Sequence, residues 1–306
     1  MTKIVVASAK RPPAAVRFLV SVPLVIAAFL LAGFVFGLVG FTPLGRALYA
    51  SVLLVLLLWG FTTLLFWLDQ VRSPLLAAAG LPFGREALRD SALGIVFGVA
   101  AVSAVVSVVA LLGRVRFEYA GAHAAALLLS LWALVAAAMV EEVVFRGYPL
   151  HRLMEAVGAP AAVAATSCLF GLAHLRNPHA SLWGGLNTAE IGALLAVAYV
   201  RTRSLWLPWG IHFGWNLALG LGYGLVLSGY SEFSTAVAGS VQGPRWLTGG
   251  EYGIEASATA TVVILVAIVV LVALVKPRPA PEIVVGGGEP PRITPGPDQI
   301  PLGGIQ

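Results

Sequence analysis

Long apolar stretches occupy most of this sequence, and they constrain its possible folds more than any other feature. A helix needs roughly 20 mostly apolar residues to cross the hydrocarbon core of a bilayer. Only 11% of the 306 residues are charged, whereas soluble domains average about 25%. We therefore predict an all-α polytopic integral membrane protein, a helical bundle of about eight transmembrane helices. The candidate spans are 18–40, 47–68, 91–113, 124–146, 160–175, 187–201, 207–228 and 256–275.

The distribution of basic residues predicts how the bundle is oriented. If the N-terminus lies inside, fourteen of the 19 Lys and Arg residues fall on the cytoplasmic side and five on the other. Because Lys and Arg concentrate in cytoplasmic loops, we expect both termini in the cytoplasm. The first apolar stretch is too long for the core of a signal peptide, so we expect it to be retained. The abundance of Ala, Gly and Val is typical of a GC-rich bacterium, which predicts a multi-pass protein of the bacterial plasma membrane.

The composition along the chain predicts six segments. The tail holds eight prolines and six glycines in 31 residues, a composition typical of disorder. The segments are a cytoplasmic N-terminus (1–17), three accessory transmembrane helices (18–119), a core of four transmembrane helices (120–228), an extracytoplasmic loop (229–255), an eighth transmembrane helix (256–275) and the disordered tail (276–306).

Several classes of membrane protease are excluded by what the sequence lacks. All three aspartates, Asp69, Asp90 and Asp298, lie outside the predicted spans, so no pair of buried aspartates is available. The zinc signature H-E-x-x-H and the serine signature G-x-S-x-G do not occur in the sequence. The single cysteine, Cys168, excludes an internal disulfide and a cysteine-rich metal site. Loops that face anionic headgroups account for the net charge of +5, so no nucleic-acid partner is expected.

Four ionisable side chains lie well inside the predicted spans: Glu141, Glu142, His174 and His212. A charge at bilayer depth costs several kcal/mol, so such residues are rare and usually functional. Glu142 and Arg146 are four residues apart with the acid first, the favourable order for an ion pair on a helix. Glu141 points about 100° away from Glu142, so it lacks this partner. Two neighbouring carboxylates in different environments are typical of acid–base chemistry.

Each of these groups also has a structural interpretation. A Glu–Arg pair at a helix end can be a boundary salt bridge, and a buried histidine can make an interhelical hydrogen bond. The sequence HFGWN (212–216) can pack the start of a helix beside an interfacial tryptophan. The four groups come from three different helices, however, and this favours one shared site.

The position of His174 raises a difficulty for this shared site. Glu141 and His212 each lie roughly 7 Å from the cytoplasmic end of their spans, at 1.5 Å per residue. If the fifth span starts at Pro160, His174 lies roughly 20 Å along it, near the opposite side. Either this span begins deep, or it tilts strongly, or the topology differs there.

Three short motifs resemble those of a known protein family. EEVVFR (141–146), FGLAH (170–174) and HFGWN (212–216) match, in order, E-E-x-x-x-R, F-x-x-x-H and H-x-x-x-N. These are the motifs of the CPBP family, the CAAX-protease and bacteriocin-processing family, also called Abi. The family includes the eukaryotic Ras-converting CAAX endopeptidase. The resemblance covers about residues 120–228 and leaves the first three spans, the 229–253 loop and the tail without a motif.

The resemblance implies an intramembrane endopeptidase of the glutamate type. Glu141 would activate a water molecule with the help of His174. His212 and Asn216 would stabilise the oxyanion of a tetrahedral intermediate, since a neutral amide can donate a hydrogen bond without transferring a proton. The expected partners are the lipid bilayer and a peptide or membrane-protein substrate.

The resemblance also implies supporting residues and leaves a metal open. Glu142 and Arg146 would orient the site, and Phe170 belongs to the second motif. We expect no cofactor, because the cation of Arg146 beside the site disfavours a second one. The alternative is a zinc ion held by Glu141, His174 and His212, an acceptable ligand set.

Two other functions compete with proteolysis. A non-catalytic membrane scaffold or bacteriocin immunity protein on the same fold would have no need for the buried charges. A transporter with a carboxylate–histidine proton relay would favour two similar halves, whereas the first three spans carry no buried charge.

Overall fold

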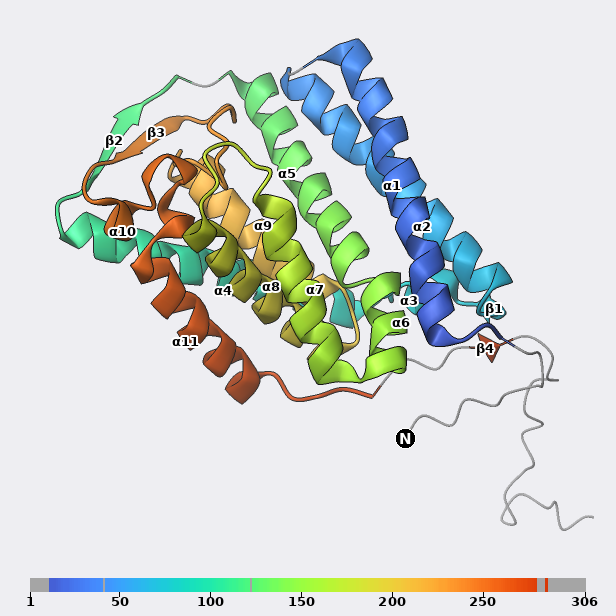
Figure 1. The fold of residues 1–306 in the computed structure, drawn as a ribbon. Coiled ribbons are helices and arrows are strands. Elements are labelled where there is room, and N and C mark those ends of the chain that lie inside the picture. Colours follow the sequence, from blue (N-terminus) through green and yellow to red (C-terminus); the bar gives the residue numbers. More distant parts are fainter. Residues whose placement is uncertain (1–10, 41, 122, 280–283, 286–306) are drawn as a thin grey trace, which may run out of the picture.

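The computed structural model describes residues 11–40, 42–121, 123–279 and 284–285 (Figure 1). The chain is mostly helical, at 73%, and the prediction of an all-α membrane protein is confirmed. The helices are α1 (Ala14–Val39), α2 (Pro43–Trp67), α3 (Leu75–Ala78), α4 (Arg85–Leu111), α5 (Ala124–Phe145), α6 (Tyr148–Val157), α7 (Ala159–His174), α8 (Leu182–Thr202), α9 (Trp206–Asn216), α10 (Arg245–Thr248) and α11 (Ala258–Leu274).

Short non-α elements complete the described chain. The strand β1 (Val71–Ser73) pairs antiparallel with β4 (Val284–Val285), and β2 (Val115–Tyr119) pairs antiparallel with β3 (Val237–Val241). Helix α9 continues as a π-helix over Leu217–Gly222. Two 3₁₀ turns, Gly250–Tyr252 and Ile254–Ala256, lead into α11. The predicted loop 229–255 therefore contains a strand, a short helix and two turns.

Each of the eight predicted spans coincides with a helix, but the count of eight spans is not confirmed. Within the described residues, four segments are long and apolar enough to cross a membrane: α1, α2, α4 and the α5–α6 stretch Ala124–Val157. Helices α7 and α11 are apolar but shorter. The number of spans, the orientation of the termini and the bacterial origin stay predictions.

The break between α5 and α6 resolves the difficulty with His174. Val157, where α6 ends, lies 16 positions after Glu141, and α7 is itself 16 residues long. Figure 1 shows α6 below the end of α5, with α7 returning upward beside them. Helix α7 therefore begins beyond the end of α5, and its last residue, His174, returns to the level of Glu141.

Charged side chains at the ends of the bundle are more buried than the sequence suggested. The predicted cytoplasmic segment 1–17 overlaps α1, and the Arg17 side chain is buried and forms an ion pair with Asp69. Asp69 also accepts a hydrogen bond from the buried Arg152 Nη1 at 2.9 Å. Burial of charges is favourable only when they are paired, and this pairing joins α1, α2 and α6.

The described residues of the predicted tail contact the rest of the chain. Arg278 donates two hydrogen bonds to Asp90, at 2.6 and 2.8 Å. Val284 and Val285 form β4. The remainder of the predicted tail, 280–283 and 286–306, lies outside the described residues.

Glycines allow α4 and α9 to pack unusually closely. A Cβ atom added at Gly98 would lie 2.1 Å from the Ile211 carbonyl oxygen, and one added at Gly214 would lie 2.4 Å from the Ile95 carbonyl oxygen. Small residues at helix interfaces let backbones approach in membrane bundles. This approach fixes α9, which carries His212 and Asn216.

We expect Gly98→Ala to destabilise the bundle by about 1–3 kcal/mol, since overpacking a tight contact costs this much. Gly37→Ala is the matched control, because a Cβ there meets nothing within 4 Å. Thermal unfolding of the purified protein in detergent, followed by size-exclusion recovery, measures both variants. Equal stability of Gly98→Ala and Gly37→Ala would contradict the close packing of α4 on α9.

Candidate functional site

A cavity of about 520 Å³ lies inside the bundle and is bounded by side chains from α1, α2, α5, α7, α8 and α9. The segment that precedes α11 also contributes to its wall. The predicted site residues that line the cavity are Glu141, Phe170, His174, His212 and Asn216. Side chains from three helices thus converge on one space, as the motif spacing predicted.

Glu141, in the last turns of α5, faces this cavity. Its Oε2 atom lies 3.7 Å from His174 Nε2 and 3.8 Å from His212 Nε2. Among the described residues, this oxygen has no hydrogen-bond partner. Separations above 3.5 Å are too long for direct hydrogen bonds, but a bridging water can serve such contacts. The carboxylate is therefore placed to hold a water molecule between itself and either imidazole.

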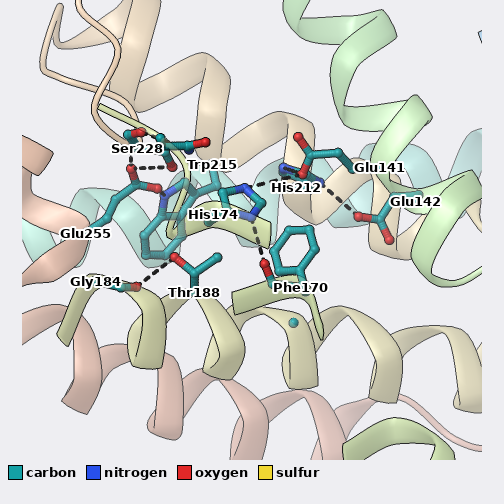
Figure 2. A network of polar contacts seen from close by, with 12 residues as sticks. Glu141, Glu142, Phe170, His174, Gly184, Thr188, His212, Trp215, Ser228 and Glu255 are labelled. Atoms are coloured by element: carbon teal, nitrogen blue, oxygen red, sulfur yellow. Dashed lines mark hydrogen bonds and ion pairs between the residues drawn. The ribbon is translucent and has the colours of Figure 1, made fainter. Parts of the chain in front are cut away.

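His174 is the last residue of α7 and is oriented by its own helix. Its Nδ1 atom lies 2.9 Å from the Phe170 carbonyl oxygen. A carbonyl only accepts hydrogen bonds, so we assign the ring proton to Nδ1. Figure 2 shows the ring between Phe170 and the Glu141 side. In the neutral ring, Nε2 then carries a lone pair toward Glu141.

Glu142 and Arg146 form the predicted ion pair, and the structure adds His212 to it. Arg146 Nη1 lies 3.1 Å from Glu142 Oε1, with both side chains fully buried. The same oxygen lies 2.9 Å from His212 Nδ1 (Figure 2). Arg146 Nη2 also donates to the Gly192 carbonyl oxygen at 3.2 Å. The ion pair therefore connects α5, α8 and α9 and fixes which nitrogen of His212 faces Glu141.

Phe170 and Asn216 occupy supporting places in this geometry. The Arg146 guanidinium carbon lies 4.2 Å from the centroid of the Phe170 ring, a cation–π contact. The Phe170 ring also meets His212 edge to face at 6.1 Å. Asn216 is the last residue of α9, one turn after His212, and the π-helix begins directly after it. Short π-helical segments are frequent at functional sites.

Glu255 is not among the predicted site residues, because it falls in the predicted loop 229–255. Glu255 is only 3% exposed and lines the cavity. It accepts hydrogen bonds from Trp215 Nε1 at 2.9 Å and from Ser228 Oγ at 3.0 Å (Figure 2). The only signal in the sequence is that Glu255 immediately precedes the last predicted span.

Asn187 lies in the first part of α8 but does not cap this helix. Ser181 caps α8 by accepting a hydrogen bond from the Gly184 amide at 3.0 Å. The buried Asn187 side chain instead donates to the backbone carbonyl oxygens of Glu255 and Ser257, at 2.7 and 2.9 Å. It therefore anchors the segment before α11 to α8.

Tyr252 lies beside the cavity on the same segment. Its hydroxyl is 3.3 Å from Thr188 Oγ1. Burial, followed by the charge of Glu255, raises the pKa of Tyr252 to about 12. The phenol therefore stays protonated at neutral pH and is able to donate a hydrogen bond.

The residues of the zinc alternative do not form a preformed metal site. Across the described ranges of the chain, no group of three His, Cys, Asp or Glu side chains is placed to hold a metal ion. The zinc alternative stays a prediction. What the arrangement offers is a carboxylate and two imidazoles around one cavity, a set that can accept and donate protons.

The comparison with protein-family models returns one match. Residues 123–218 match the family described as Type II CAAX prenyl endopeptidase Rce1-like. This segment runs from α5 through α9, about a third of the chain, and contains all three motifs. Neither the curated proteins nor the solved structures yield a match. The family resemblance drawn from the motifs is confirmed.

Replacing Arg146 by Met should destabilise the protein by about 3–5 kcal/mol, because removing one partner of a buried pair leaves an uncompensated charge. The double variant Glu142→Gln with Arg146→Met removes both charges and should recover much of this loss. Chemical unfolding in detergent measures the difference. Glu251→Gln, at an exposed pair with His179, is the control and should leave stability unchanged. A double variant no more stable than Arg146→Met would contradict the buried ion pair of Glu142 and Arg146.

Proposed function

Because residues 123–218 match the Rce1-like CAAX-protease family, we propose that this chain is an intramembrane endopeptidase that hydrolyses a peptide bond with activated water. The observation that carries this proposal is the approach of Glu141 Oε2 to both imidazoles, at 3.7 and 3.8 Å, on the wall of one cavity. A carboxylate without a hydrogen-bond partner on that oxygen is available to accept a proton.

Glu141 and His174 act on the water. The water oxygen attacks the scissile carbonyl carbon while Glu141 takes one of its protons, and His174 Nε2 accepts a hydrogen bond from the same water. The new C–O bond produces a tetrahedral oxyanion. The proton then passes to the amide nitrogen, the C–N bond breaks, and Glu141 returns to its carboxylate form. No covalent enzyme intermediate is needed.

His212 and Asn216 stabilise the oxyanion. Protonated His212 donates Nδ1–H to Glu142, and its Nε2–H faces the cavity. The two carboxylates that face its nitrogens, at 2.9 and 3.8 Å, favour this imidazolium. The Asn216 amide supplies a second donor one helical turn away. Donors held in place before the reaction stabilise developing charge most effectively.

Glu142 and Arg146 hold His212 in this orientation. Their pair is fully buried, so it is screened little by solvent and keeps one geometry. A non-catalytic scaffold or immunity protein is the less favoured function, because such a protein has no use for a carboxylate placed against two imidazoles in the cavity. The substrate we propose is a peptide or a membrane-protein segment that enters the cavity from the bilayer.

Glu141→Gln should lower the cleavage rate by about 100-fold or more, the contribution that general-base catalysis makes. The assay uses purified protein in liposomes and an internally quenched, farnesylated peptide that ends in a C-a-a-X sequence. Glu118→Gln, at an exposed acid of β2, is the control and should cleave at the wild-type rate.

If this peptide is not cleaved, the substrate is sought among membrane proteins. Membrane fractions of cells with wild-type protein and with Glu141→Gln are compared for altered peptide termini. Identical termini in both samples, together with an uncleaved peptide, would overturn the proposed peptidase.

Cleavage should continue unchanged in 1,10-phenanthroline or EDTA, because the mechanism proposed uses no metal ion. The measurement is the initial rate before and after chelation, followed by metal analysis of the purified protein. A rate lost on chelation and restored by zinc would replace the metal-free mechanism while leaving the peptidase assignment intact.

A further inference from the structure

We propose that Glu255 is a positioning residue of this site, which ties the turn that carries His212 and Asn216 to the turn that carries His174. The inference rests on the proposed function. It concerns a residue outside the 123–218 segment that matches the family, so it goes beyond the three motifs.

The first contact of Glu255 reaches the third motif. Its Oε1 atom accepts a hydrogen bond from Trp215 Nε1 at 2.9 Å. Trp215 is 3% exposed and immediately precedes Asn216. A fixed Trp215 ring restricts rotation of α9 about its axis, and this rotation sets where His212 and Asn216 point.

The second contact reaches the second motif. Glu255 Oε2 accepts hydrogen bonds from the backbone amide and the hydroxyl of Ser228, at 2.5 and 3.0 Å. The carbonyl oxygen of Ser228 accepts a hydrogen bond from Asn177 Nδ2 at 3.0 Å. Asn177 lies three residues after His174, and its backbone amide donates to the His174 carbonyl oxygen at 3.1 Å. The chain of contacts thus runs from Glu255 to the end of α7.

The backbone of Glu255 is fixed by a separate hydrogen bond. Its backbone carbonyl oxygen accepts the Asn187 amide at 2.7 Å, which fixes the 3₁₀ turn to α8. Burying a carboxylate is costly unless hydrogen bonds compensate it, and the three side-chain hydrogen bonds compensate this one. Burial raises the pKa of Glu255, and the hydrogen bonds from Ser228 and Trp215 together with the charge of His174 oppose this rise.

The arrangement explains why an acid stands at this position. A single carboxylate accepts from two directions at once, whereas an amide of the same shape offers one accepting oxygen and one donating nitrogen. Glutamine would turn its NH₂ group toward the Ser228 amide or toward Trp215. One of the two connections would then be lost.

The test measures kcat and KM on the farnesylated quenched peptide for Glu255→Ala, Glu255→Gln and Trp215→Phe, with Trp215→Phe also combined with Glu255→Ala. Misplacing catalytic groups by about 1 Å can cost 100-fold in rate, so Glu255→Ala should lower kcat by about 10- to 100-fold with KM within about threefold. Glu255→Gln should lower kcat by a smaller factor than Glu255→Ala. Trp215→Phe removes the N–H donor, together with part of the indole ring system, and should lower kcat by several-fold.

The double variant with Glu255→Ala should be no slower than Glu255→Ala alone, because Glu255→Ala already removes the contact with Trp215 and residues of one network show non-additive effects. Glu251→Gln, an exposed acid of the same segment, is the matched control and should keep the wild-type kcat. If Glu255→Ala does not fold, a loss of kcat at unchanged KM in Glu255→Gln decides.

Three results would overturn the inference: wild-type kcat in the Glu255 variants, losses confined to KM, or full additivity of Glu255→Ala with Trp215→Phe. Each of them requires an active wild-type protein. An inactive wild type, or an active Glu141→Gln variant, speaks against the proposed function instead, so the two failures are distinguishable.

Discussion

The buried pair of Glu142 and Arg146 is the interaction on which the rest of the site depends. Both side chains are removed from solvent, and an uncompensated charge in this apolar bundle would be strongly destabilising. The Glu142 carboxylate is compensated by Arg146 on its own helix and by His212 on α9. The guanidinium also reaches the backbone of α8 through Gly192. One charge-compensation requirement thereby fixes three helices relative to one another.

The neighbouring acid, Glu141, takes no part in this pair and is available for chemistry. Glu141 precedes Glu142 in the chain, but the helical turn directs it into the cavity, with a side chain that is 31% exposed. Its approach to His174 and His212 leaves space for water rather than for a direct hydrogen bond. Two adjacent glutamates therefore have different tasks because their surroundings differ, the pattern that acid–base sites use elsewhere.

Helix length and helix packing place the remaining groups. Because α6 extends beyond the end of α5, α7 can bring His174 back to the level of Glu141. The glycine contacts between α4 and α9 fix the position of the helix that carries His212. On the other side, the segment before α11 closes the cavity with Glu255, which contacts Trp215 and Ser228. Residues within the family-matched segment supply the reactive groups, and residues beyond it supply part of their support.

The sequence by itself determined the membrane class, the positions of the long helices and three ionisable residues of the cavity, Glu141, His174 and His212. These follow from local properties: apolar length, the i, i+4 spacing of Glu142 and Arg146, and the rarity of charge in apolar spans. Only the tertiary structure decided that His212 pairs with Glu142, that Asp69 joins Arg17 and Arg152, and that Glu255 belongs to the site. These partners lie from 27 to 83 positions apart or in segments between helices. No periodicity along the chain encodes such contacts, because they depend on how the helices turn back and pack.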